Sequence, residues 1–203
     1  MKNIVTTLAA LAAVTVAAQA APQIKVTEVM YTGLFGEFVE ITNTGDAQQN
    51  MTGWSFSDNS RTPDETSIAG IGALDAGEVA VITEVSDAIF IQAWYTEPGK
   101  TALAAANIVE NNVANLGRSD EVNIYDASDV LVDRVTYNDQ TSNGPRSEDI
   151  SAVPKDTWNF TSANMGTDWV LSTDAQVTGE WKAGVSGASG PVGSPGVLVL
   201  ADY

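Results

Sequence analysis

Three aspartates around one predicted turn are the first residues whose type and spacing point to chemistry. Asp126, Asp129 and Asp133 lie in and just after the stretch 126–129. Ca²⁺ takes several oxygen ligands, which a loop can supply from aspartate side chains and main-chain carbonyls. Alternatively, these aspartates are solvated turn residues, because an Asp side chain can accept a hydrogen bond from the backbone of its own turn. The sequence has no EF-hand pattern, so the predicted Ca²⁺ site rests on these three residues alone.

Three tryptophans near the C-terminal end form a second candidate site. Trp158, Trp169 and Trp181 follow a long polar stretch. An exposed aromatic side chain suits the face of a sugar ring, and neighbouring polar residues such as Asn159 and Asp168 suit its hydroxyl groups. The alternative is that these tryptophans close the ends of the fold. We therefore regard the three as candidate ligand-binding residues.

Glutamates near the start of the chain raise the question of acid–base catalysis. Glu28, Glu37 and Glu40 lie in or beside predicted strands. A glycosidase needs two carboxylates at a fixed separation in a cleft, and this spacing fixes no such pair. Glu40 lies between two β-branched residues, where burial would require a partner such as Arg118, Arg134 or a backbone amide. We expect these glutamates to be structural.

The chain has no cysteine and no histidine. Their absence excludes disulfides, most transition-metal sites and the Ser-His-Asp and Cys-His nucleophile systems. The sequence also lacks a phosphate loop, a dinucleotide fingerprint and a G-x-S-x-G elbow. We therefore expect no enzymatic activity and no required cofactor, with Ca²⁺ as the one candidate ion. A hydrolase that uses carboxylates alone is the remaining catalytic alternative.

The charge of the chain restricts its partners. The sequence contains 26 acidic and 9 basic residues, which gives a formal net charge of −17. Such a protein is repelled by nucleic acids and by anionic membranes. It is well suited to remain soluble and to attract cations. We expect the partner to be a protein or a glycan.

Strand-forming patterns dominate the first half of the chain. Residues 24–31, 37–42 and 53–57 are rich in β-branched and aromatic side chains, and turn residues separate them. Side chains alternate between the two faces of a strand. One face of the first strand is therefore expected to carry Ile24, Val26, Glu28 and Met30.

Further along, the pattern predicts one helix between two strand regions. Residues 79–83 form a short apolar strand, and residues 86–95 have apolar side chains at helical spacing. Residues 111–137 predict a hairpin whose turn is the stretch 126–129. The alternation on its second arm is interrupted, so we expect a bulge near Asp133 and Arg134.

The sequences EVMY, GEFVEITNTGD and MTGWSFSD together resemble the opening of the lamin-tail domain. LDAGEVAVI, the hairpin sequence NLGRSDEVNIYDASDVLVDRVTYND and a closing SPG resemble later parts of the same family. Lamin-tail domains are immunoglobulin-like and occur behind nuclear lamin rods and in many secreted bacterial proteins. The resemblance implies an all-β, two-sheet antiparallel sandwich with one short helix and an irregular C-terminal extension.

Composition divides the chain into three parts. Residues 1–20 have a basic start, an apolar run and the sequence Ala-Gln-Ala at their end, which is typical of a cleaved secretory signal. A membrane anchor is the alternative, but the apolar run is shorter than the roughly 20 residues that a span needs. Residues 21–140 form the predicted sandwich, and residues 141–203 a loop and extension that complete the same domain.

Together these patterns predict a secreted, non-catalytic module for binding or scaffolding, located at the cell surface, in the extracellular space or in the periplasm. The alternative is a module that binds Ca²⁺ or polysaccharide through the acidic turn or the late tryptophans. After signal cleavage we expect no membrane span.

Overall fold

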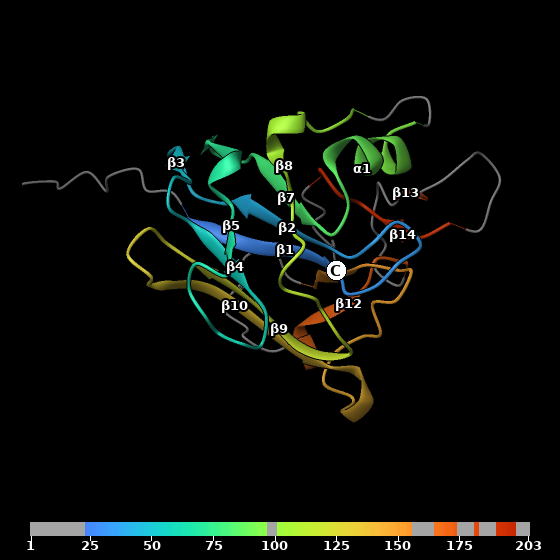
Figure 1. Ribbon diagram of the computed structural model, residues 1–203. Helices are drawn as coiled ribbons and strands as arrows, with labels where there is room; N and C mark the ends of the chain where they lie inside the picture. Colours follow the sequence, from blue (N-terminus) through green and yellow to red (C-terminus); the bar gives the residue numbers. More distant parts are fainter. Residues whose placement is uncertain (1–22, 97–100, 156–164, 174–180, 183–189, 198–203) are drawn as a thin grey trace, which may run out of the picture.

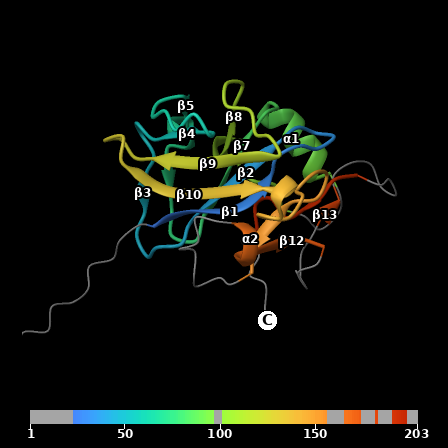
Figure 2. The ribbon, with the colours of Figure 1, turned by 90° about the horizontal axis from the view of Figure 1, so that it is seen from below.

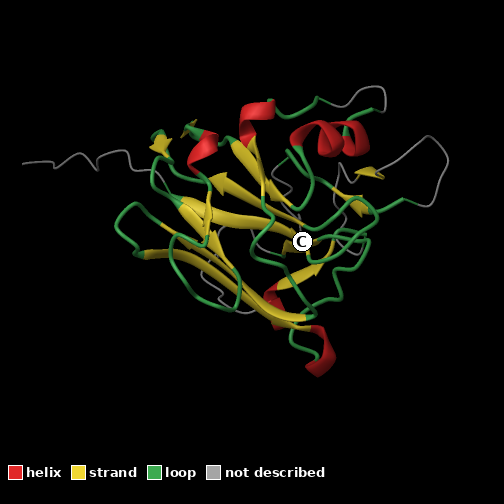
Figure 3. Cartoon of the chain, in the orientation of Figure 1, coloured by secondary structure: helices red, strands yellow, loops and turns green. Residues whose placement is uncertain are grey.

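Strands make up most of the ordered secondary structure (Figure 3). The structure is a computed structural model that describes residues 23–96, 101–155, 165–173, 181–182 and 190–197. The predicted secretory signal lies outside these residues. No helix in the described part of the chain has the length and apolar character needed to cross a membrane.

The larger of two main sheets contains six strands. Its neighbours are antiparallel except β7 and β8, which run parallel. In spatial order the strands are β12 (Trp169–Leu171), β11 (Ala152–Pro154), β1 (Ile24–Met30), β2 (Phe38–Asn43), β7 (Val79–Thr83) and β8 (Ile108–Glu110).

The smaller main sheet contains four antiparallel strands, and two separate strand pairs lie outside both sheets. The four strands are β10 (Leu131–Asn138), β9 (Ser119–Tyr125), β4 (Ser55–Ser57) and β5 (Thr66–Ser67). The separate pairs are β3 (Gln49–Asn50) with β6 (Ala73–Leu74), and β13 (Trp181–Lys182) with β14 (Val192–Gly193).

The two main sheets enclose one apolar core. Val39 from the larger sheet and Phe56, Val122 and Ile124 from the smaller one are each at most 1% exposed. Full burial of such a side chain contributes roughly 1.5–3 kcal/mol, so this core is the main source of stability. The predicted two-sheet sandwich is therefore confirmed.

A helix covers the opposite face of the larger sheet (Figure 1). Helix α1 (Asp87–Trp94) begins after Ser86, whose hydroxyl accepts a hydrogen bond from a main-chain amide of the first turn. The rings of Phe90 and Trp94 contact Phe38 edge-on, with centroids 5.7 and 5.5 Å away. The predicted helix is confirmed. The remaining helical turns are η1 (Ala69–Ile71), η2 (Ala105–Asn107), η3 (Asp139–Thr141) and α2 (Met165–Asp168).

The prediction that Ile24, Val26, Glu28 and Met30 share one face of β1 is wrong, because β1 contains a bulge. Its register against β2 shifts between Val26 and Glu28, so Thr27 is an extra residue. A bulge of one residue exchanges the two faces of the strand beyond it. Glu28 consequently faces helix α1, as does Met30. The residues of this segment that reach the core between the sheets are Ile24, Val26, Val29 and Tyr31.

The predicted hairpin is present as β9 and β10, which run side by side in both ribbon views (Figures 1 and 2). Its register shifts between Leu131 and Asp133, so the extra residue is Val132. The bulge therefore exists but lies slightly closer to the turn than the position predicted near Asp133 and Arg134.

Candidate functional site

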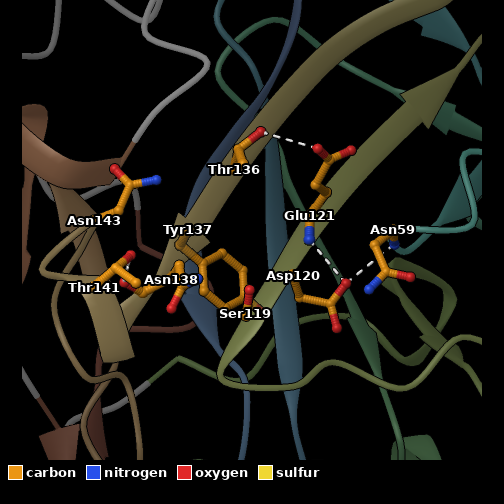
Figure 4. Close-up of a pocket in the computed structure, with 9 residues that line it drawn as sticks. All are labelled: Asn59, Ser119, Asp120, Glu121, Thr136, Tyr137, Asn138, Thr141 and Asn143. Atoms are coloured by element: carbon orange, nitrogen blue, oxygen red, sulfur yellow. Dashed lines mark hydrogen bonds between the residues drawn. The ribbon is translucent and has the colours of Figure 1, made fainter.

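A polar pocket lies where β9 begins and β10 ends (Figure 4). The register places Tyr137 opposite Asp120 and Thr136 opposite Glu121. Alternation turns Asp120 and Tyr137 toward the interior and their neighbours toward the outer face. The pocket has a volume of about 310 Å³. Its lining consists of Asn59, Ser119, Asp120, Glu121, Thr136, Tyr137, Asn138, Thr141 and Asn143.

Backbone amides fix the carboxylate of Asp120. Its Oδ1 accepts hydrogen bonds from the amides of Asn59, at 3.1 Å, and of Glu121, at 2.8 Å. Its Oδ2 accepts from the amide of Gly117 at 2.8 Å. Burial raises the pKa of Asp120 above its ordinary value despite these three donors. Asp120 thus ties the start of β9 to the loop that contains Asn59.

Arginines fix the second carboxylate, Glu121, on the outer face. Arg61 donates from Nε at 2.7 Å and from Nη2 at 2.5 Å, so the pair is bidentate. The hydroxyl of Thr136 donates to Glu121 at 3.4 Å, and Arg134 lies 3.5 Å away. The hydrogen bonds from Arg61 lower the pKa of Glu121, so this side chain is an anion at neutral pH.

Tyr137 is the most deeply buried residue of the pocket lining. Its side chain is 1% exposed, and its hydroxyl has no hydrogen-bond partner within the described part of the chain. Its ring stacks on Tyr31, with centroids 5.8 Å apart. Burial raises the pKa of Tyr137, and the nearby charges of Asp120 and Glu37 raise it further. The hydroxyl therefore stays protonated and can donate to an acceptor.

An ion pair holds the outer rim of the site. Arg118 donates from Nε to Asp139 at 3.0 and 3.1 Å, and the hydroxyl of Tyr31 donates to the same carboxylate at 2.6 Å. Burial acts against ionisation of Asp139, but the hydrogen bonds from Arg118 and Tyr31 outweigh it and lower its pKa. This pair anchors η3, which contributes Thr141 to the pocket.

Hydroxyl, amide and carboxylate groups therefore converge on one concave surface. Side chains of these kinds can both donate to and accept from the hydroxyl or amide groups of a ligand. In the sequence, Asp120, Glu121 and Asp139 are acidic residues in or beside strands, and nothing in their spacing joins them into one site. Asp120 lies two residues before the apolar Val122, so strand periodicity could have predicted that both side chains face inward. No pattern close in sequence identifies Asn143 as a pocket residue.

The structure does not bring the predicted Ca²⁺ ligands together. Asp126 accepts hydrogen bonds from the amides of Ser128 and Val130 at 2.8 and 3.0 Å, so it stabilises its own turn. Asp129 has a φ of 60°, and Asp133 accepts from the amide of Val26 at 2.8 Å in the larger sheet. Among the described residues, no group of three or more Asp, Glu, His or Cys side chains is arranged to hold a metal. Ca²⁺ binding at these aspartates stays a prediction.

The predicted tryptophan site is described only in part. Trp169 is 5% exposed and packs into the core between the sheets, which leaves little surface for a sugar ring. Trp158 lies outside the described residues, and of Trp181 only the strand that contains it is described. A role of these two residues in ligand binding stays a prediction.

The three early glutamates are all buried. Glu37 is 5% exposed and accepts a hydrogen bond from the amide of Leu116 at 2.7 Å. Burial raises the pKa of Glu37 to about 8. Glu28 and Glu40 are each 1% exposed. The partner of Glu40 is a hydroxyl and a backbone amide rather than either predicted arginine.

Comparison with known protein families gives a match. A family model for the Lamin Tail Domain matches residues 17–139, more than half of the 203-residue chain. The matched region includes β1 to β10 and therefore both sides of the sandwich core. A search of curated proteins finds no match.

Proposed function

Since the chain belongs to the lamin-tail domain family, we propose that it is a secreted, non-catalytic binding module whose polar pocket holds a hydroxyl-rich ligand. The observation that supports this proposal is the pocket at the end of β9 and β10. Its volume of about 310 Å³ lies near the lower end of the range of roughly 300–1,000 Å³ for small-molecule sites.

The chemistry of the lining favours a neutral, polyhydroxylated ligand such as a segment of polysaccharide. Ser119 and Thr141 supply hydroxyl groups, and Asn59 and Asn143 supply amides that can donate and accept. The net charge of −17 repels anionic ligands. Arg61 pairs with Glu121, and three backbone amides donate to the carboxylate of Asp120, so neither carboxylate of the lining requires a ligand cation as its partner.

Secretion is the second part of this proposal. It is supported by the basic start, apolar run and small residues of the first 20 positions, which are typical of a cleaved signal. A protein outside the cytoplasm would meet cell-wall and extracellular polysaccharides, which carry the hydroxyl groups that the pocket suits. Fractionation of the producing cells and their medium tests this part separately.

A glycan array followed by calorimetry tests the binding function. The best glycan on the array is titrated into the wild-type protein and into Asn143→Ala, which removes one pocket amide. Loss of one neutral hydrogen bond predicts roughly 0.5–1.5 kcal/mol weaker binding, or about a threefold to tenfold higher Kd. Asn112→Ala is the matched control, because Asn112 is an exposed asparagine that does not line the pocket.

The affinities of the two variants decide whether the pocket binds the glycan. Weaker binding by Asn143→Ala, with Asn112→Ala unchanged, supports the proposal. Absence of any glycan binding, or equal affinity for all three proteins, would overturn the assignment of this ligand class to the pocket.

A further inference from the structure

Two glutamates lie directly opposite each other on the helix-covered face of the larger sheet. Glu28 of β1 pairs in register with Glu40 of β2. Each is 1% exposed. The bulge at Thr27 produces this arrangement, because it turns Glu28 onto the same face as Glu40. Burying two neighbouring carboxylates is costly unless other groups satisfy them or one of them is neutral.

A short segment near the C-terminal end satisfies both carboxylates. The amide and the hydroxyl of Ser194 donate to Glu28 at 2.7 and 2.8 Å. The amide of Gly196 donates to Glu40 at 2.8 Å. These contacts join residues that are more than 150 positions apart in the sequence. The glutamate pair therefore anchors the segment 193–196 to the sheet.

The shape of the site fits the sequence Gly-Ser-Pro-Gly. A Cβ at position 193 would lie 2.8 Å from Glu28 Oε1, and Gly196 has a φ of +91°. The hydroxyl of Tyr95 donates to the carbonyl of Pro195 at 2.8 Å. Larger residues at either glycine would collide with the carboxylate or strain the backbone. The sheet thus contains a built receptor for this tetrapeptide.

Hydroxyl groups around Glu40 allow it to be neutral. The hydroxyl of Thr27 lies 2.6 Å from Glu40 Oε1 and 2.9 Å from the hydroxyl of Thr42. A hydroxyl can donate or accept, so a protonated Glu40 can donate to Thr27 while its other oxygen still accepts from Gly196. Burial, and then the charge of Glu28, raise the pKa of Glu40 well above its ordinary value.

Of the two glutamates, Glu28 is better suited than Glu40 to carry a single negative charge. Both of its oxygens accept hydrogen bonds from Ser194, which favours the ionised form. Burial nevertheless raises its pKa to about 7. The pair is therefore neutral in mildly acidic solution and gains its first charge near neutral pH. A second charge would place two anions side by side in the interior.

We propose that the Glu28–Glu40 pair is a protonation-controlled receptor that retains the chain's own Gly193–Gly196 segment while at least one of the two glutamates is neutral. When both glutamates ionise, their repulsion weakens the anchor and the segment detaches from the sheet. The described titratable groups that face this site are Glu28 from β1, Glu40 from β2 and Tyr95 at the end of α1. Burial raises the pKa of Tyr95, so Tyr95 remains neutral and adds no charge over the same range.

Hydrogen exchange of the Ser194 and Gly196 amides tests this receptor directly, because these amides donate to the two carboxylates. Protection is measured on the full chain from about pH 6 to about pH 10, where linkage predicts the change. It is corrected for faster intrinsic exchange and compared with the amides of Val39 and Ile82 in the same sheet. In wild type, protection of the two segment amides should fall selectively, by about tenfold per pH unit, until both carboxyl groups are ionised in the attached state.

Glu40→Gln is the decisive variant. Its amide nitrogen can donate to Thr27 and its carbonyl can accept from Gly196, so it imitates neutral Glu40 and should keep the segment protected at high pH. Ser194→Ala removes the hydroxyl donor and should lower protection already at neutral pH. Should Glu40→Gln fail to fold, the wild-type pH series and Ser194→Ala still decide the question. A wild-type protection independent of pH, or the same fall in Glu40→Gln, would overturn the proposal.

Discussion

The sharpest stability prediction concerns Glu37, whose buried carboxylate accepts a hydrogen bond from the amide of Leu116. Glu37 is 5% exposed, and burial raises its pKa to about 8 from an ordinary value of 4.5. A carboxyl group whose pKa is higher in the folded chain than in the unfolded chain favours folding at low pH. This contribution is complete below about pH 4.5 and is lost progressively as the pH rises to about 8.

The size of the loss follows from the two pKa values. One pKa unit corresponds to about 1.4 kcal/mol, so the interval from 4.5 to about 8 gives an upper bound of about 5 kcal/mol. That is comparable to the whole unfolding free energy of a small domain, roughly 5–15 kcal/mol. Glu28 acts in the same direction, with a pKa raised from 4.5 to about 7. Wild-type stability should therefore fall steeply from weakly acidic to weakly alkaline solution.

Glu37→Gln isolates this contribution, because glutamine keeps a carbonyl acceptor for the amide of Leu116 but cannot ionise. Unfolding free energies are measured by denaturant titration at several pH values. The unfolding free energy of the variant, relative to that of wild type, should increase by several kcal/mol as the pH rises to about 8. The slope due to Glu28 is common to both proteins and cancels in the difference. The reasoning would be refuted if the difference in unfolding free energy between the two proteins changed by less than about 1 kcal/mol over this pH range.

Three further substitutions test individual contacts. Ser86→Ala removes the N-cap of α1 and should lower the unfolding free energy by about 1 kcal/mol in a denaturant titration. Tyr137→Phe removes a buried hydroxyl that has no hydrogen-bond partner among the described residues, so the unfolding free energy should change by less than about 1 kcal/mol in the same titration; a larger loss would show that the hydroxyl has a partner. Val122→Ala creates a cavity in the core and should lower stability by about 2 kcal/mol or more, measured in the same way.

Local patterns in the sequence were sufficient for most of the sandwich. Strand patterns predicted the hairpin of β9 and β10, and apolar side chains at helical spacing predicted α1. These features depend on residues close in sequence, where side-chain periodicity and turn chemistry dominate. The bulge in β1 was missed because Thr27 is a good strand former and nothing nearby disturbs the pattern.

The two sites depend on contacts that local patterns do not contain. The pocket joins the loop at Asn59 to β9 and to Asn143 after β10. The glutamate receptor joins β1 and β2 to Ser194. Glu40 was expected to need a partner if it were buried between its apolar neighbours. The identity of that partner required the three-dimensional fold, because a backbone amide leaves no signature in the residue type.

The most direct test of the central claim is a nuclear magnetic resonance titration of the full chain with the best glycan from the array. Binding in the pocket predicts amide shifts concentrated at Ser119, Asp120 and residues 136–143. Shifts centred instead on the turn 126–129, on α1 or on Trp169 would contradict the account, because they would place the ligand away from the polar pocket.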